Sequence, residues 1–141
     1  MDTRNETQRA HLHPPTPRRK RSGATPEARV SKAVDAYLKK IRAHVLRTGA
    51  GMAEFEGRKV SIGQAGCSDL TVCLPSAPGG MSAFCAIEIK AGKNKPSKLQ
   101  ARYLDKVRAV GGLAIVAYSV ADVRAALIER FGETTVKGWE R

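Results

Sequence analysis

The chain has 141 residues, 42% of them hydrophobic and 5% aromatic, which is typical of one folded domain with a core of aliphatic side chains. Its 25 Lys and Arg residues against 13 Asp and Glu residues give a formal net charge of +12, which favours a polyanionic partner, with nucleic acid the first expectation. The three cysteines have neither disulfide-framework nor zinc-site spacing, and no apolar run is long enough for a membrane span or a signal peptide. We therefore expect a cytoplasmic protein with no membrane partner.

Residues 1–24 differ in composition from the rest of the chain. They include three prolines, the basic run 18–21 and almost no large apolar side chain. This composition predicts a disordered basic tail, followed by one folded domain over residues 25–141. The tail is either an arm that follows DNA phosphates or a solvated leader, and the sequence favours neither.

The first predicted element is a helix over about residues 26–43. Thr25 suits the N-cap, Pro26 the first helical position and Glu27 the acidic first turn. Apolar residues recur at helical spacing, at Val30, Val34, Leu38, Ile41 and Val45.

Three short extended runs follow this helix. They cover residues 59–62, 70–74 and 84–90, and the turn-rich segments 63–66 and 75–80 separate them. This pattern predicts a three-stranded antiparallel meander.

A helix, a strand and a last helix are predicted next. Ser97 and Gln100 have capping-box spacing and open a helix over about 97–110, whose apolar face would be Leu99, Tyr103, Val107 and Val110. The apolar run 113–118 is typical of a buried central strand.

Ser119 and Asp122 open the last predicted helix, which runs to about Phe131. Beyond it, Trp139 either packs back on the domain or serves a subunit contact.

Glu88 and Lys90 lie two residues apart in the predicted strand 84–90, so their side chains share one face. An antiparallel strand that starts from Asp69 would bring a second carboxylate beside Glu88, and two close carboxylates suit a hard divalent cation such as Mg²⁺. Two carboxylates, a metal and an amine are able to hydrolyse a phosphodiester. The alternative is a salt bridge of Glu88 with Lys90, or of Asp69 with a neighbouring lysine, which explains an isolated E-x-K pattern without catalysis.

The passages around these side chains carry a family resemblance. They are 66–70 (GCSDL), 86–90 (AIEIK), 95–100 (KPSKLQ) and 111–114 (GGLA). In this order they closely resemble the VRR-NUC (virus-type replication-repair nuclease) family of the PD-(D/E)xK nuclease superfamily, over about residues 25–128.

The resemblance implies an α/β fold with a mixed sheet, a restriction-endonuclease-like αβββαβ core and a C-terminal helix. It implies that Asp69, Glu88 and the main-chain carbonyl of Ile89 bind Mg²⁺ or Mn²⁺. Lys90 would position or activate the attacking water. Glu27 would match the family's first-helix acid and join the metal ligands, and Gln100 would take the family's glutamine position as a further catalytic residue.

Two of these residues have a simpler structural explanation. A negative charge such as that of Glu27 stabilises the first turn of a helix without any catalysis. Gln100 sits at the third position of the capping box, where its side chain bonds back to the N-cap amide. Both roles of Gln100 are compatible with each other.

Five basic residues are candidate DNA contacts. Lys93 and Lys95 follow Lys90 in a glycine-containing loop, and the alternative is an exposed loop kept soluble by lysines. Lys98 and Arg102 lie on the second helix, where a solvated face is the alternative. Arg47 follows the first helix as in the family but lacks the aromatic neighbour often seen there, so its role stays open.

These features favour a Mg²⁺- or Mn²⁺-dependent DNA endonuclease acting in replication, recombination or repair. Stand-alone VRR-NUC proteins of this size resemble viral and phage Holliday-junction resolvases. The resemblance implies branched or four-way-junction DNA as substrate, 5′-phosphate products, a homodimer and a bacterial or phage-infected cell. The alternatives are a flap, nick or duplex nuclease of the same fold and a non-catalytic DNA-binding protein.

Overall fold

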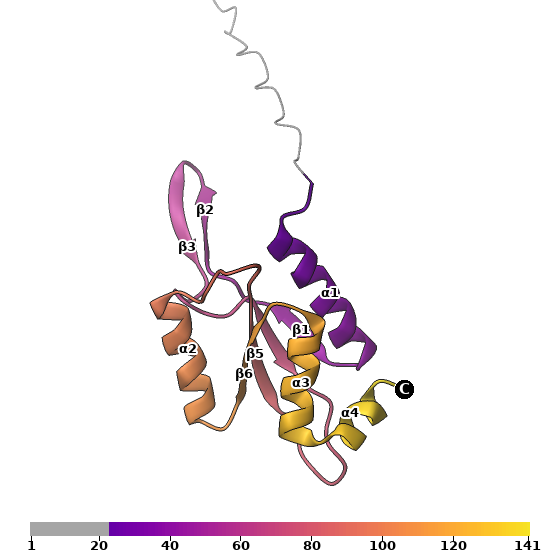
Figure 1. The fold of residues 1–141 in the computed structure, drawn as a ribbon. Coiled ribbons are helices and arrows are strands. Elements are labelled where there is room, and N and C mark those ends of the chain that lie inside the picture. The colour runs from indigo at the N-terminus through magenta and orange to yellow at the C-terminus, as the bar shows by residue number, and fades with distance from the viewer. Residues whose placement is uncertain (1–22) are drawn as a thin grey trace, which may run out of the picture.

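A computed structural model describes residues 23–141, and the predicted basic tail lies outside them except for its last two residues. Residues 23–141 form four helices and six strands in a mixed α/β arrangement (Figure 1). The helices are α1 (Pro26–Lys40), α2 (Lys98–Ala109), α3 (Val120–Phe131) and α4 (Glu133–Trp139). The strands are β1 (His44–Arg47), β2 (Gly51–Phe55), β3 (Arg58–Ile62), β4 (Leu70–Cys73), β5 (Phe84–Ile89) and β6 (Leu113–Ala117).

Four of the strands form the central sheet in the order β1-β4-β5-β6. The pairs β1–β4 and β4–β5 are antiparallel, and β6 runs parallel to β5. A parallel pair needs a crossover connection, and α2 provides it between β5 and β6. The chain order α1, β1, β4, β5, α2, β6 confirms the predicted αβββαβ core, and α3 and α4 follow it.

Helices cover both faces of this sheet (Figure 1). On one face, α1 and α3 bury the larger core cluster, which includes Val34, Leu38 and Val123. On the other face, α2 packs Leu104 and Val107 against Ala86 of β5. The core is therefore aliphatic, as the composition predicted.

The side chains of β5 point alternately to the two faces of the sheet. Cys85, Ile87 and Ile89 belong to the larger cluster, whereas Ala86 belongs to the α2 side. Because side chains alternate along a strand, Glu88 also points to the α2 side.

β2 and β3 form a separate two-stranded sheet, inserted between β1 and β4. This hairpin projects away from the body of the molecule (Figure 1). In the described part of the chain, neither core cluster contains a residue of the hairpin.

The meander differs from the prediction in its first strand. The predicted strand 59–62 lies in β3 and pairs only with β2, so the first strand of the sheet is β1 instead. Every residue of β3 is exposed, whereas Val45 of β1 is half-buried against the core. The helical spacing that included Val45 was misleading, because Arg42 adopts a left-handed conformation (φ 62°) just after α1 and ends the helix.

Two apolar patterns were also assigned wrongly. β6 is an edge strand of the sheet rather than a central one. On α2 the buried side chains are Leu104 and Val107, while Leu99 and Val110 are exposed. The covering of β6 by α2 and α3 explains its apolar run without a second neighbouring strand.

The capping signals were predicted correctly. Thr25, Ser97 and Ser119 are the N-caps of α1, α2 and α3. Helix α4 was not predicted; Trp139 at its end packs edge to face on Phe131, with ring centroids 5.2 Å apart. Of the two roles considered for Trp139, the structure shows packing on the domain.

No helix of residues 23–141 combines the length and the apolar character needed to cross a membrane.

Candidate active site

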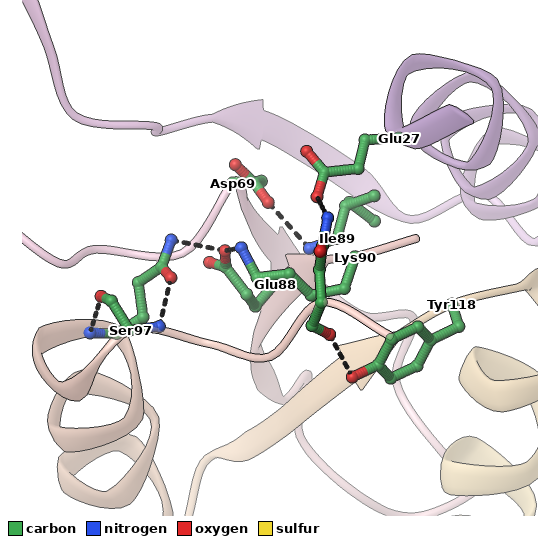
Figure 2. Close-up of polar contacts among 9 residues, drawn as sticks. Glu27, Asp69, Glu88, Ile89, Lys90, Ser97 and Tyr118 are labelled. Atoms are coloured by element: carbon green, nitrogen blue, oxygen red, sulfur yellow. Dashed lines mark hydrogen bonds and ion pairs between the residues drawn. The ribbon is translucent and has the colours of Figure 1, made fainter. Parts of the chain in front are cut away.

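Asp69 and Glu88 lie beside each other at one end of the β4–β5 pair. Leu70 of β4 pairs with Ile87 of β5, so Asp69, one residue earlier, is next to Glu88 on the same face of the sheet. Figure 2 shows the side chains of Asp69, Glu88 and Lys90 close together, with Glu27 entering from α1. The arrangement of the two carboxylates that the sequence predicted is therefore present.

Backbone contacts fix the position of Asp69. Its Oδ2 accepts a hydrogen bond of 2.7 Å from the main-chain amide of Ile89. The amide of Thr48 donates to the Asp69 carbonyl at 3.0 Å, and the Thr48 hydroxyl donates to the Ser68 carbonyl at 3.0 Å. The Asp69 side chain is thus bonded to β5, and its main chain is bonded to the residue that follows β1.

Glu88 is completely buried, with a side-chain exposure of 0%. Its Oε1 accepts hydrogen bonds from Gln100 Nε2 at 2.5 Å and from Lys90 Nζ at 2.6 Å. Its Oε2 is buried and has no hydrogen-bond partner among the described residues. Burial raises the pKa of Glu88, with a contribution from the charge of Asp69, while the hydrogen bond and the charge of Lys90 oppose the shift.

Lys90 follows β5 and carries the positive charge of the site. Burial lowers the pKa of Lys90, but the hydrogen bond and the charge of Glu88, with the charges of Asp69 and Glu27, outweigh burial and raise it. The side chain is therefore an ammonium at neutral pH. The salt bridge considered for Glu88 and Lys90 is present, with 2.6 Å between Lys90 Nζ and Glu88 Oε1.

Gln100 makes two side-chain contacts, one in the capping box of α2 and one with Glu88. Its Oε1 accepts from the Ser97 amide at 2.8 Å, which completes the capping box of α2. Its Nε2 donates to Glu88, as described above. The helix cap and the carboxylate are thereby joined through one side chain.

Glu27 lies in the first turn of α1 and faces the loop after β5. Its Oε1 accepts a hydrogen bond of 3.4 Å from Asn94 Nδ2, and Tyr118 Oη donates to the Asn94 carbonyl at 2.7 Å. Sequence reasoning missed Asn94 and Tyr118, because neither belongs to a charge or spacing pattern.

Asp69 and Glu88 fit a divalent cation. A buried carboxylate oxygen without a partner is an available ligand, and Asp69 supplies a second carboxylate. Residues 23–141 contain no group of three or more His, Cys, Asp or Glu that could hold a metal. Mg²⁺ is commonly held by one or two protein carboxylates, with waters and substrate phosphates completing its coordination.

The candidate DNA contacts are distributed around this site. Arg47 lines a cavity together with Glu27 and Asp69. Lys93 lines a neighbouring cavity with Glu27. The other three candidates are exposed side chains without a specific contact in the described residues, namely Lys95, Lys98 and Arg102.

No family model and no curated protein matches the chain. A solved structure titled "VRR_NUC domain" is similar to it, with 29% sequence identity, coverage of 77% of this chain and 99% of that chain, and a TM-score of 0.49. The family in that title is the one that the sequence motifs resemble.

Proposed function

We propose that this chain is an endonuclease that hydrolyses DNA phosphodiester bonds with Mg²⁺ or Mn²⁺ bound at Asp69 and Glu88. Glu88 carries the proposal: its carboxylate is buried beside that of Asp69, and one of its oxygens has no hydrogen-bond partner within residues 23–141, which costs folding free energy. A cation bound there offsets that cost. A salt bridge for stability alone needs neither Asp69 nor the unpaired oxygen.

Each residue has a role in this proposal. Asp69, Glu88 and the Ile89 carbonyl hold the cation, with Glu27 as a further acid at the edge of the site. When bound, the cation would supply positive charge to the phosphate as negative charge develops on it. Gln100 fixes the orientation of Glu88, and the Lys90 ammonium donates a hydrogen bond to the attacking water.

Cleavage of labelled DNA in Mg²⁺, Mn²⁺ or EDTA tests the proposal. The variants are Asp69→Asn, Glu88→Gln and Lys90→Ala, with Glu129→Gln and Arg130→Ala on the far end of α3 as charge-matched controls, since both residues are exposed. We expect cleavage in either metal, at least a hundredfold loss in the three site variants, corresponding to about 3 kcal/mol, and full activity in the controls. Cleavage in EDTA would exclude the metal-dependent mechanism. Full cleavage by the Asp69 and Lys90 variants would exclude catalytic roles for these two residues.

We further propose that the substrate is a four-way DNA junction and that the chain acts as a homodimer, since symmetrical cleavage of a junction needs two sites. Such an enzyme would act in the cytoplasm of a bacterium or a phage-infected cell and leave 5′-phosphates. Parallel assays on junction, flap, nicked and duplex DNA test the substrate. Light scattering at assay concentration tests the dimer, and a monomer there would argue against junction resolution.

A further inference from the structure

Arg47 ends β1 and lies against α1, the helix that carries Glu27. Its Nη1 donates a hydrogen bond of 3.1 Å to Ser31 Oγ, and its Nη2 lies 3.9 Å from Asp35 Oδ1. Ser31 and Asp35 are four residues apart, so they share one face of α1. Two groups on one helix therefore hold one guanidinium.

The restraint on Arg47 is notable because the side chain is otherwise open to solvent, with 61% exposure. A long exposed side chain loses conformational entropy when it is fixed in one geometry, and this loss costs free energy. Within residues 23–141 its guanidinium makes no further hydrogen bond, so the rest of its N–H donors are available. A planar guanidinium fork matches the oxygens of a phosphate.

The position of Arg47 indicates what it binds. Arg47 and Ser31 line a cavity of about 360 Å³, whose wall also includes Glu27, Asp69 and Ile89. The cavity thus joins the proposed metal ligands to an arginine outside the metal site. DNA carries a phosphate at every nucleotide, so a strand cleaved at Asp69 places further phosphates beside the cleaved one.

We propose that Arg47 binds a DNA backbone phosphate next to the one that is cleaved, and that Ser31 and Asp35 are positioning residues for Arg47. This inference rests on the proposed function for the identity of the ligand. Ser31 and Asp35 do not touch the phosphate; they act through the arginine.

The test measures binding of the full chain to labelled duplex DNA in EDTA by fluorescence anisotropy, over a series of salt concentrations. We expect Arg47→Ala to weaken binding about tenfold and to reduce the slope of log K against log salt by about one. Arg130→Ala removes the same charge from an exposed position on α3 and should change the slope by much less.

Ser31 is tested by a pair of substitutions. Ser31→Ala should weaken binding about threefold to tenfold, in line with the loss of one hydrogen bond, and Ser31→Thr, which keeps the hydroxyl, should restore it. Thermal unfolding of both variants checks that the fold is intact.

Equal binding by the Arg47 and Arg130 variants would overturn the phosphate assignment. Wild-type binding by Ser31→Ala, with weak binding by Arg47→Ala, would overturn the positioning role of Ser31. Because binding is read in EDTA, a failure of cleavage with metal would count against the proposed function alone.

Discussion

At the scale of single residues, the proposed metal site depends most on the buried carboxylate of Glu88. One of its oxygens accepts two hydrogen bonds and the other accepts none among the described residues. Burial favours the neutral carboxyl, and the nearby Lys90 ammonium favours the charged form. A bound divalent ion would stabilise the charged form of Glu88. The effect of the ion on the free energy of unfolding is measurable without any substrate.

Metal binding should therefore stabilise the wild-type fold. At a Mn²⁺ concentration a hundred times its Kd, the gain is about 2.7 kcal/mol, which calorimetry would detect as a higher Tm. Asp69→Asn and Glu88→Gln should abolish the metal-dependent part of the Tm shift, and Glu129→Gln should retain it. An identical shift in all four proteins would show that Mn²⁺ binds elsewhere.

The two roles of Gln100 can be separated by substitution. Ser97→Ala removes the N-cap oxygen and should lower the free energy of unfolding by about 1 kcal/mol, with little change in kcat. Gln100→Glu keeps an acceptor suited to the capping box but replaces the donor to Glu88 with a third carboxylate beside Glu88 and Asp69. We expect a lower free energy of unfolding in urea, because like charges then meet, and a large loss of cleavage per folded molecule, which Ser97→Ala should not show. Normal cleavage by Gln100→Glu would exclude the role in orienting Glu88.

At the scale of elements, the start of α2 and the segment before β4 are fitted closely together. Gly66 has φ 80°, and a Cβ there would lie 2.7 Å from the backbone of Leu99, next to Gln100. The contact is with backbone, so it cannot be relieved by a side-chain rotation. The packing of Gly66 on α2 therefore sets the distance between the Asp69 segment and Gln100.

Gly66→Ala should disturb both stability and catalysis. The backbone conformation alone costs on the order of 1–3 kcal/mol, and the clash with Leu99 adds to it and displaces α2 from Glu88. Gly79→Ala is the matched control, because Gly79 has φ 72° and open space at the Cβ position. It should lose stability but keep its cleavage rate per folded molecule. Equal cleavage by the two variants would contradict the coupling through α2.

The sequence predicted the elements that have local signals at their ends. The N-caps Thr25, Ser97 and Ser119 mark three helices correctly, because a side-chain oxygen next to free amides acts locally. β1 was missed, because Val45 continued the helical spacing of α1 and the stabilising contacts of β1 are with β4, far along the chain. A strand that is stabilised mainly by pairing with a distant strand has only a weak signal in its own sequence.

The same distinction holds for the candidate site. Glu88 and Lys90 could be placed on one face from their spacing, and the register of β4 with β5 confirms the place of Asp69. The contact of Arg47 with Ser31 could not be predicted, because it depends on how α1 lies over β1. The catalytic role of Lys90 and the metal-binding roles of Asp69 and Glu88 are proposals.

At the scale of the whole molecule, the C-terminal end is tied to two helices. Glu140 accepts hydrogen bonds of 2.8 Å from Arg124 of α3 and from Tyr37 of α1. The hydrogen bond from Arg124, then that from Tyr37, lowers the pKa of Glu140. The pKa of Tyr37 is raised, first by burial and then by Glu140.

This cluster predicts a pH dependence of stability. Because the pKa of Glu140 is lowered in the fold, its contribution to stability is present above the ordinary glutamate pKa of about 4.3 and is lost as pH falls from there through the lowered folded-state pKa. The difference in Tm between wild type and Glu140→Gln should therefore be constant near neutral pH and shrink below pH 4. The exposed Glu129→Gln variant should show no such trend. A difference that persists unchanged in acid would assign the effect to packing.

The β2–β3 hairpin has a consequence for how proteins with this core can diverge. Gly63, just after β3, lies against Ala50, just before β2, with 3.4 Å between its Cβ position and the Ala50 Cα. The chain leaves the core and returns to it at one point, so the hairpin can be shortened, lengthened or exchanged while the register of β1 with β4 is kept. Ala50 also lines the cavity that contains Asp69. A segment that tolerates changes in length therefore begins at the edge of the cavity that contains Asp69. Under the proposed function, a change there would alter which DNA shapes can approach the site.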